Sequence, residues 1–321
     1  MGFQRTESDY FDLSSPFTPL PKYGHLSQKS PEYSAAEPFL REALSELNAQ
    51  PDFPSMRAVA GDPDAVMPAN GPNRYKDIVT ELIQIPARDG AMIELKVYRS
   101  TKVNRNAVLM YRMHGGKWCI GRHEVDGVDN VYAAMNPDIV VVSVDYRLLG
   151  IDPERIIISG GSAGGQLAAS LALECQEKKI AGIIAQVLHF LPTCHPKFFP
   201  RDKYEYGSYI QNHDDCVLDT LGMEDAWDAY TPNAKPDYRH SPLLAESFKG
   251  LPPTLIQCAG LDPLRDDALA YAEALKNDGV DVEVHCYAGV PHWFAYTMTE
   301  SPQSIQFLER YNAFLSKQTR Q

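Results

Sequence analysis

The sequence contains a serine between glycines, in a pattern typical of nucleophilic catalysis. Residues 160–164 read Gly-Gly-Ser-Ala-Gly, with Ser162 at the centre, between an apolar run and a helical pattern. A nucleophilic serine on a sharp strand-to-helix turn needs glycines on both sides because backbone and neighbouring elements approach closely. The alternative is a glycine-rich turn with a capping serine; a phosphate loop is disfavoured because no Gly-Lys-Ser/Thr follows. The pattern predicts that Ser162 is a nucleophile.

A second motif, His114-Gly115-Gly116-Lys117-Trp118, directly follows an apolar run. Acyl transfer generates an oxyanion, and small residues let backbone N–H groups turn toward it without obstruction by side chains. The N–H groups of Gly115 and Gly116, together with that of Ala163, are therefore candidates for an oxyanion hole. The alternative is an ordinary glycine turn that closes a strand.

Two downstream residues, Asp262 and His292, complete a possible catalytic set. Histidine can accept a serine proton at neutral pH, and a carboxylate holds the imidazole tautomer and stabilises the imidazolium. Asp262 follows the apolar run 254–258, and open α/β sheets place their sites at the carboxyl ends of strands. Alternatively, Asp262 caps the following helix and His292 is a loop histidine with a structural partner. The chain order Ser, Asp, His favours the catalytic interpretation.

From about residue 78 to 314, the chain resembles the hormone-sensitive-lipase-like carboxylesterases of the α/β-hydrolase fold. The resemblance implies that Ser162 is the nucleophile, His292 the base and Asp262 its orienting group, with neither a metal nor an organic cofactor. It also implies that residues around a lid select the acyl and alcohol groups. The motifs that carry the resemblance occur in order: His-Gly-Gly, Asp145-Tyr146-Arg147-Leu148, Gly-Gly-Ser-Ala-Gly-Gly, Asp-Pro-Leu-Arg-Asp and Pro-His-Trp-Phe.

The chain departs from the family pattern at two motif positions. Lys117 stands where the family usually has a third glycine, and Gly161 stands where it usually has an aspartate. A lysine charge at the mouth of the pocket would favour acidic or polar esters; the alternative is a solvated Lys117 that points outward.

The elements that must position these residues follow an α/β pattern. Most expected strands are continuous apolar runs, as in a parallel sheet with helices on both faces. Alternation with period two also predicts a hairpin, strands 80–86 and 93–99, around the turn at 88–90. We therefore expect an α/β-hydrolase fold with a mostly parallel central sheet. The remaining expected strands are 107–113, 139–144, 155–159, 182–188 and 254–258, and the expected helices are 166–177, 266–277 before Gly279, and 302–316 behind Ser301.

The 321 residues suit one large domain, 1–321, with a lid made of two parts. The N-terminal lid segment is 1–75, where a helix beginning at Ser34, with Glu37 as its capping-box partner, carries apolar residues on one face, from Phe39 to Leu47. The lid insertion is 193–250, whose aromatic residues at 198–209 would line or cover an acyl pocket. Within it, His213-Asp214-Asp215-Cys216 and Cys194-His195 have no standard metal-site spacing, and a solvated loop is expected.

The connection between two expected parallel strands is unusually short. Only residues 147–154 join the strand that ends at Tyr146 to the strand 155–159. A parallel crossover normally takes a dozen or more residues and includes a helix. One crossover helix is therefore expected to be missing after Leu148, which leaves part of a sheet face exposed or covered by another segment. This departure keeps open a second interpretation, a catalytically impaired or ligand-binding relative of the same fold.

Composition restricts the possible partners. With 30 basic and 42 acidic residues, the formal net charge is −12, so nucleic acid is a poor partner. No apolar run approaches a membrane span, no secretory signal is evident, and the six cysteines are scattered, so a cytoplasmic location is expected. The sequence predicts a serine hydrolase for small or medium carboxylic esters, including a lactone or an acetylated metabolite. It does not indicate an oligomeric state.

Overall fold

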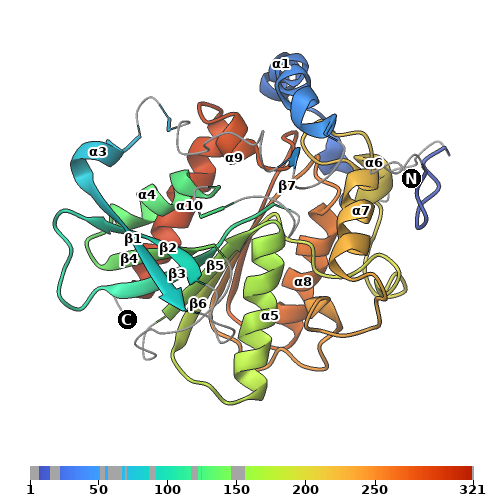
Figure 1. The fold of residues 1–321 in the computed structure, drawn as a ribbon. Coiled ribbons are helices and arrows are strands. Elements are labelled where there is room, and N and C mark those ends of the chain that lie inside the picture. Colours follow the sequence, from blue (N-terminus) through green and yellow to red (C-terminus); the bar gives the residue numbers. More distant parts are fainter. Residues whose placement is uncertain are drawn as a thin grey trace.

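The described part of the chain forms an eight-stranded sheet with the order β1-β2-β4-β3-β5-β6-β7-β8 (Figure 1). The computed structural model describes residues 7–14, 22–50, 55–56, 67–68, 71–86, 92–116, 122–123, 125–145 and 156–319. Pairing is antiparallel between β1 and β2 and between β2 and β4, and parallel elsewhere. The strands are β1 Ile78–Pro86, β2 Met92–Ser100, β3 Val108–Met113, β4 Ile139–Val144, β5 Ile156–Gly161, β6 Ile183–His189, β7 Thr254–Ala259 and β8 Val282–Tyr287.

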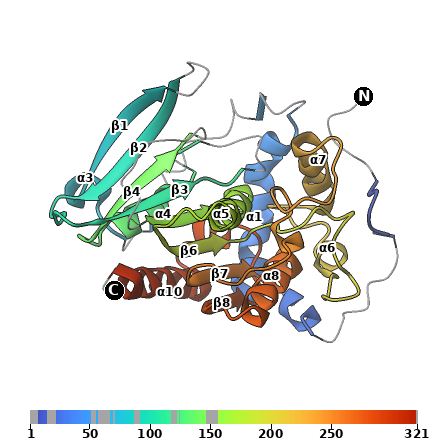
Figure 2. The ribbon, with the colours of Figure 1, turned by 90° about the horizontal axis from the view of Figure 1, so that it is seen from below.

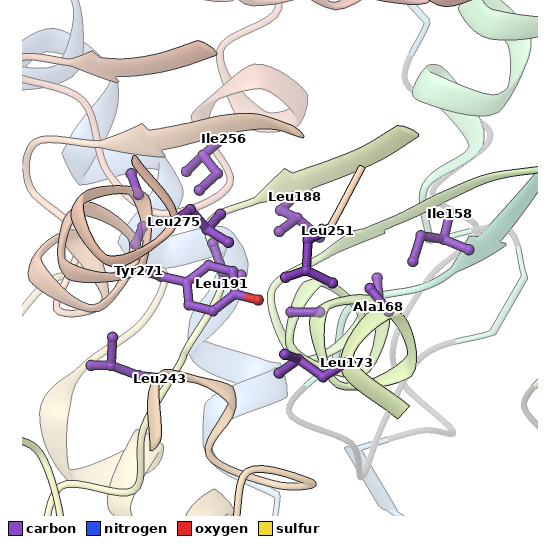
Figure 3. Packing of buried hydrophobic residues seen from close by; sticks show 14 of the residues in the cluster. Ile158, Ala168, Leu173, Leu188, Leu191, Leu243, Leu251, Ile256, Tyr271 and Leu275 are labelled. Atoms are coloured by element: carbon purple, nitrogen blue, oxygen red, sulfur yellow. The ribbon is translucent and has the colours of Figure 1, made fainter. Parts of the chain in front are cut away.

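Helices cover both faces of this sheet. One face packs on α5 and α8, where Leu173 and Leu275 meet Leu188 and Ile256 of the strands (Figure 3). The other face packs on α4 and α10. The continuous apolar runs reflect this burial on both sides, because successive strand residues point to opposite faces. The α/β-hydrolase fold class expected from the sequence is confirmed.

The helices agree with most of the sequence expectations. Helices at 166–177, 266–277 and 302–316 are present with small differences at their ends. The strand β8 and the helices α4 and α7 were not predicted. Within the described ranges, no helix has the length and apolar character needed to cross a bilayer. The helices are α1 Pro31–Asn48, α3 Arg74–Asp77, α4 Gly127–Ala134, α5 Ala163–Glu177, α6 Ser208–Gln211, α7 Thr220–Tyr230, α8 Arg265–Asn277, α9 Phe294–Thr297 and α10 Pro302–Thr319, with the 3-10 turns η1 Gly24–Ser27 and η3 Pro242–Leu244.

The helix α1 begins earlier than expected. The hydroxyl of Ser30 accepts a hydrogen bond from the N–H of Tyr33, and Pro31 occupies the first helical position, where its missing N–H is not needed. Ser34 instead donates its hydroxyl to the carbonyl of Ser30, so the expected capping box is wrong. Phe39, which we expected on the buried face, is 70% exposed.

The described parts of the two expected lid segments contact each other. Tyr33 of α1 donates its hydroxyl to Asp215 at 2.7 Å, and the ring of Phe11 stacks on Tyr209. Asp215 and Cys216 are buried against Tyr33 of α1, and Cys194 and His195 are buried too, so the expectation of a solvated loop is wrong for these four residues. Asp214 is exposed, as expected. In Figure 2, α6 and α7 lie at the opposite end of the molecule from the hairpin β1–β2. Assignment of these segments as a lid remains a prediction.

The short connection after β4 lies outside the described residues, as do Lys117 and the turn 88–90. The strands that it joins are both parallel to β3 and lie on either side of it, as expected for a crossover. On the α5 face of these strands, Tyr111 and Val142 are buried, whereas Leu109 and Val140 are only partly buried. Whether a crossover helix has been lost therefore stays a prediction.

If a helix is missing after Leu148, an inserted helix should stabilise the fold. We expect an amphipathic segment of about 12 residues at this point to raise the unfolding temperature and ester turnover, because it would bury the partly exposed apolar side chains of β3 and β4. Calorimetry and a chromogenic ester assay measure both effects. A flexible glycine–serine insert of equal length is the control, and an unchanged melting temperature and turnover with the helical insert would contradict the hypothesis.

Candidate active site

Ser162 lies on the strand-to-helix turn between β5 and α5. Its backbone has φ 53° and ψ −125°, a strained conformation for a residue other than glycine. The Ser162 N–H donates to the carbonyl of His189 at 2.8 Å, and its own carbonyl accepts from the N–H of Gly165 at 2.9 Å. These bonds hold the turn against the end of β6, and the strand, turn and helix predicted around the motif are confirmed.

The glycines of the motif are required by close backbone contacts. A Cβ atom on Gly160 would lie 2.1 Å from the carbonyl oxygen of Gly164, inside any allowed contact. A Cβ atom on Gly164 would lie 2.2 Å from the carbonyl oxygen of Met113 at the end of β3. The first turn of α5 therefore touches both β5 and β3, and only glycine allows that distance.

Asp262 and His292 are held together by a short hydrogen bond. His292 Nδ1 lies 2.7 Å from Asp262 Oδ2, and both side chains are buried. The other carboxylate oxygen, Oδ1, accepts the N–H of Leu264 at 2.9 Å, in the turn before α8. The same carboxylate therefore orders this turn and holds the imidazole, but it does not cap α8, whose N-cap residue is Leu264 without a side-chain cap. The hydrogen bond to His292 fixes Nδ1 and leaves Nε2 for other partners. The catalytic role of Asp262 remains a prediction.

Ser162 and His292 are carried by adjoining segments. The indole of Trp293, the residue after His292, lies against Gly161, the residue before Ser162. Among the described residues, no hydrogen bond joins Ser162 Oγ to the His292 imidazole. In structures without substrate, catalytic hydrogen bonds are often long and tighten only in the complex. The structure thus brings the two segments into contact without forming this bond.

The glycine loop after β3 lies beside the same turn. His114 is buried, and its Nδ1 lies 2.6 Å from the carbonyl oxygen of Gly115. Gly116 has φ 122°, a conformation that favours glycine. A Cβ atom on Gly115 would lie 2.8 Å from the carbonyl oxygen of Gly161, so the loop and the serine turn are in close contact. His114 also lowers the pKa of Asp145, whose Oδ1 is 3.8 Å from His114 Nε2.

Beneath the site lies a buried ion cluster centred on Arg112. Arg112 donates to Asp126 at 2.7 Å and to Asp129 at 2.6 Å, and also to the hydroxyl of Ser159 at 2.7 Å. Asp129 also accepts from the hydroxyl of Tyr296 at 2.6 Å. A buried charge is costly unless it is paired, so these contacts tie α4, β3, β5 and α9 together. These are the strands and helices next to the serine, the glycine loop and His292.

The pKa values of the two aspartates in this cluster are shifted in opposite directions. Burial raises the pKa of Asp126 in spite of its contact with Arg112. Burial acts in the same direction on Asp129, but Arg112, His189 and Tyr296 together hold its pKa below the usual value. These residues are not among those that the sequence motifs predict. The available signal was a single arginine within the apolar run 107–113, which required a buried counter-ion.

A further buried carboxylate, Asp267, anchors the segment that follows β6 to α8. Asp267 is fully buried, and its Oδ1 accepts from the N–H groups of Thr193 at 2.8 Å and Cys194 at 3.0 Å. Its Oδ2 has no hydrogen-bond partner among the described residues. Burial raises the pKa of Asp267 to about 8. A proton on Oδ2 fits this arrangement, because the acceptor role of Oδ1 is already used.

Among the described residues, no group of three or more His, Cys, Asp or Glu side chains is arranged to hold a metal ion. The five cysteines that the structure describes are free, and they are Cys175, Cys194, Cys216, Cys258 and Cys286.

Comparisons with known proteins agree with the fold. Residues 148–296 match the α/β hydrolase fold family. The AB hydrolase superfamily protein B1A11.02 of Schizosaccharomyces pombe is 30% identical over 256 residues, which cover 69% of this chain and 75% of that protein. Carboxylesterase NlhH of Mycobacterium tuberculosis is 30% identical over 224 residues, 60% of this chain and 68% of that protein.

Solved structures give the same result. The thermostable esterase from Pseudomonas putida ECU1011 has a TM-score of 0.75 and 27% identity to this chain, covering 89% of this chain and 97% of that one. The fold and the likenesses define an α/β hydrolase. Within that fold, the chain belongs to the hormone-sensitive-lipase-like carboxylesterase family, as the sequence motifs indicated, and it is a carboxylic ester hydrolase.

The close packing of the serine turn predicts a large effect of a single methyl group. Gly164→Ala should destabilise the protein by roughly 3 kcal/mol or more, because its Cβ atom meets the backbone of β3 and neither element can move independently. Gly279→Ala is the matched control: nothing lies within 4 Å of that Cβ, and only its φ of 81° costs free energy, about 1 kcal/mol. Denaturant unfolding measures both, and equal losses would contradict the packing argument.

The raised pKa of Asp267 predicts a pH-dependent stability. In the folded chain, Asp267 keeps its proton up to about pH 8. In the unfolded chain, it releases this proton near the ordinary aspartate pKa of 3.8. Folding therefore takes up a proton in this interval, and the free energy of unfolding should fall as pH rises from about 4 to about 8. Asp267→Asn should flatten this fall, so the variant gains stability relative to the natural chain as pH rises.

Thermal unfolding at pH 5 and pH 8 measures the difference. Asp214→Asn is the control, because it removes the carboxylate of an exposed aspartate and leaves the buried carboxylates unchanged. Parallel pH curves for the natural chain and Asp267→Asn would show that the carboxylate is ionised in the folded protein.

Proposed function

We propose that the chain hydrolyses small or medium carboxylic esters through an acyl-enzyme formed on Ser162. His292 acts as general base and then as general acid, and Asp262 orients the imidazole. The N–H groups of Gly115, Gly116 and Ala163 stabilise the oxyanion. The observation that carries this proposal is the buried 2.7 Å hydrogen bond between His292 and Asp262, on a segment that contacts the serine turn.

The reaction proceeds in two halves. In the first, Ser162 Oγ attacks the ester carbonyl carbon while its proton moves to His292 Nε2. The tetrahedral intermediate collapses, the C–O bond to the alcohol breaks, and His292 returns the proton to the departing alcohol. In the second, water attacks the acyl-enzyme, His292 takes a proton from that water and returns it to Ser162, and the carboxylic acid leaves. No metal or organic cofactor is needed for these steps.

Strain at Ser162 supports the role of nucleophile. A positive φ at a residue other than glycine persists only when its surroundings enforce it, and such residues gather at functional sites. Here the contacts at Gly160 and Gly164 and the bond from Ser162 N–H to His189 enforce it. The N–H of Ala163, at the first position of α5, is also well placed for an oxyanion, because the amino end of a helix carries partial positive charge.

Substrate selection belongs in this proposal to the segments 1–75 and 193–250, acting as a lid. Phe198 and the aromatic residues up to Tyr209 lie in the second segment, and Phe199 stacks on Tyr206 with ring centroids 3.7 Å apart. A lactone or an acetylated metabolite is as consistent with the site as a simple ester. A cytoplasmic location of the protein is also part of this proposal.

A second candidate function is binding without turnover. Two observations favour it: Ser162 Oγ has no hydrogen bond to His292 among the described residues, and the connection 147–154 is short. The presence of all three side chains, with the His292–Asp262 bond formed, favours the hydrolase.

A fluorophosphonate probe separates the two functions. We expect covalent labelling of Ser162, identified by peptide mapping, because an activated serine attacks phosphorus and the adduct resembles the tetrahedral intermediate. Ser162→Ala should remain folded and unlabelled. Asp262→Asn should lower kcat for a short chromogenic ester by roughly 10⁴-fold, because the imidazole then adopts the wrong tautomer.

Ser170→Ala is a matched control, since this second buried serine lies on α5 two turns from Ser162 and should label and turn over as the natural chain does. Folded natural protein that is neither labelled nor active on any ester of a graded chain-length panel would support the binding function instead.

A further inference from the structure

Trp293 has an unusual backbone conformation for its size. Its φ is 64° and its ψ is 15°, in the left-handed region that bulky residues rarely adopt. Within the described part of the chain, the residues other than glycine with positive φ are Ser162, Lys179, Phe190 and Trp293. Three of these four, Ser162, Phe190 and Trp293, lie at the candidate active site, since the Phe190 ring lies 5.6 Å from the His292 ring between centroids. The strain at Trp293 therefore indicates that its surroundings hold it in place.

The ring of Trp293 lies between the serine turn and the glycine loop. A Cβ atom on Gly161 would lie 3.0 Å from Trp293 Cη2 and 3.1 Å from Cζ3. A Cβ atom on Gly115 would lie 2.6 Å and 2.9 Å from the same two atoms. The edge of the indole thus fills the space that side chains at both positions would otherwise use. Gly161, a departure from the family pattern, is matched to this ring.

Other aromatic rings keep the indole in this position. Its centroid lies 4.7 Å from that of Tyr296 and 5.9 Å from that of Phe190. Tyr296 is in turn bonded to the buried carboxylate of Asp129. The Trp293 side chain is nevertheless only partly buried. It is therefore a rigid, partly accessible surface directly beside the residue that precedes the nucleophile.

The ring lies on the side of the site that carries His292. In the proposed reaction His292 gives its proton to the leaving alcohol, so the alcohol must depart next to that imidazole. Trp293 directly follows His292 in the sequence, and its ring contacts Gly161 and Gly115. We propose that Trp293 is a specificity-determining residue that limits the size of the alcohol part of the ester. This inference rests on the proposed function.

Kinetics with two ester series test this role. One series keeps an acetyl group and changes the alcohol from a primary to an α-branched and then an aryl-substituted secondary alcohol. The other keeps a primary alcohol and lengthens the acyl chain. Trp293→Gly, which also suits the positive φ, should raise the kcat/KM ratio of bulky to small alcohol roughly tenfold or more. The acyl series should keep its order of preference.

Trp293→Ala and Trp293→Phe serve as further variants. Trp293→Ala removes the ring without adding glycine flexibility and should show the same shift as Trp293→Gly. Trp293→Phe keeps part of the ring and should give an intermediate ratio. Fluorophosphonate labelling of each variant verifies that the serine remains reactive.

The fit between Gly161 and the ring has a test that does not depend on activity. Gly161→Ala should lower the melting temperature in the natural chain, and Trp293→Gly should remove that loss. Gly115→Ala is the comparison variant, because its Cβ meets both the ring and the carbonyl oxygen of Gly161 at 2.8 Å, so part of its loss should persist when the ring is removed.

The outcomes distinguish two failures. If the natural chain hydrolyses no ester and is not labelled, the proposed function is overturned, and the role of Trp293 falls with it. If the natural chain is active but removal of the ring leaves the alcohol ratio unchanged, or shifts the acyl series alone, only the role of Trp293 is overturned. Additive melting-temperature losses for Gly161→Ala and Trp293→Gly would contradict the contact itself.

Discussion

The site depends on the close approach of one helical turn to two strands. The first turn of α5 touches the backbone of β5 at Gly160 and that of β3 at Met113, at distances that no side chain allows. This contact accompanies the positive φ of Ser162 and brings the glycine loop after β3 beside it. The relative position of Ser162 and the proposed oxyanion donors is thus set by contacts between backbone atoms.

The rest of the site is supported by buried charges rather than by apolar packing alone. Arg112 and Asp129 connect β3, β5, α4 and α9 through buried hydrogen bonds. Asp267 connects α8 to the segment after β6. Buried ion pairs contribute little net stability, but breaking one leaves an unpaired charge, so they define geometry strongly. Their position below the site suits elements that must be held in one arrangement.

Much of the fold and the candidate site was predictable because both have local signals. Apolar runs of five to seven residues fix the central strands, and glycines around Ser162 mark a turn that few other structures require. The start of α1 was misassigned because two serines, Ser30 and Ser34, both precede helical residues, and Pro31 decides between them. The strand β8 was missed because Glu283 and His285 interrupt its apolar pattern at the sheet edge.

The remaining features depend on contacts between distant segments. Nothing near Asp267 in the sequence indicates that Thr193 and Cys194 donate to it, and nothing near Trp293 indicates that its ring reaches Gly115. Such contacts arise only when the sheet order is known, since they join residues more than 70 positions apart. Asp215 is a further case, because its burial requires the helix α1 from the other end of the chain.

One consequence follows from the way Asp262 divides its two oxygens between the Leu264 N–H and the His292 imidazole. Because each of its two oxygens forms a hydrogen bond, this carboxylate is held against rotation. Its negative charge is therefore already oriented toward the imidazole before any ligand enters. In solution, water molecules would have to turn to stabilise a new positive charge on the ring, at a cost in free energy. Here the orientation is established during folding, and the imidazolium would form in a field that needs no reorganisation.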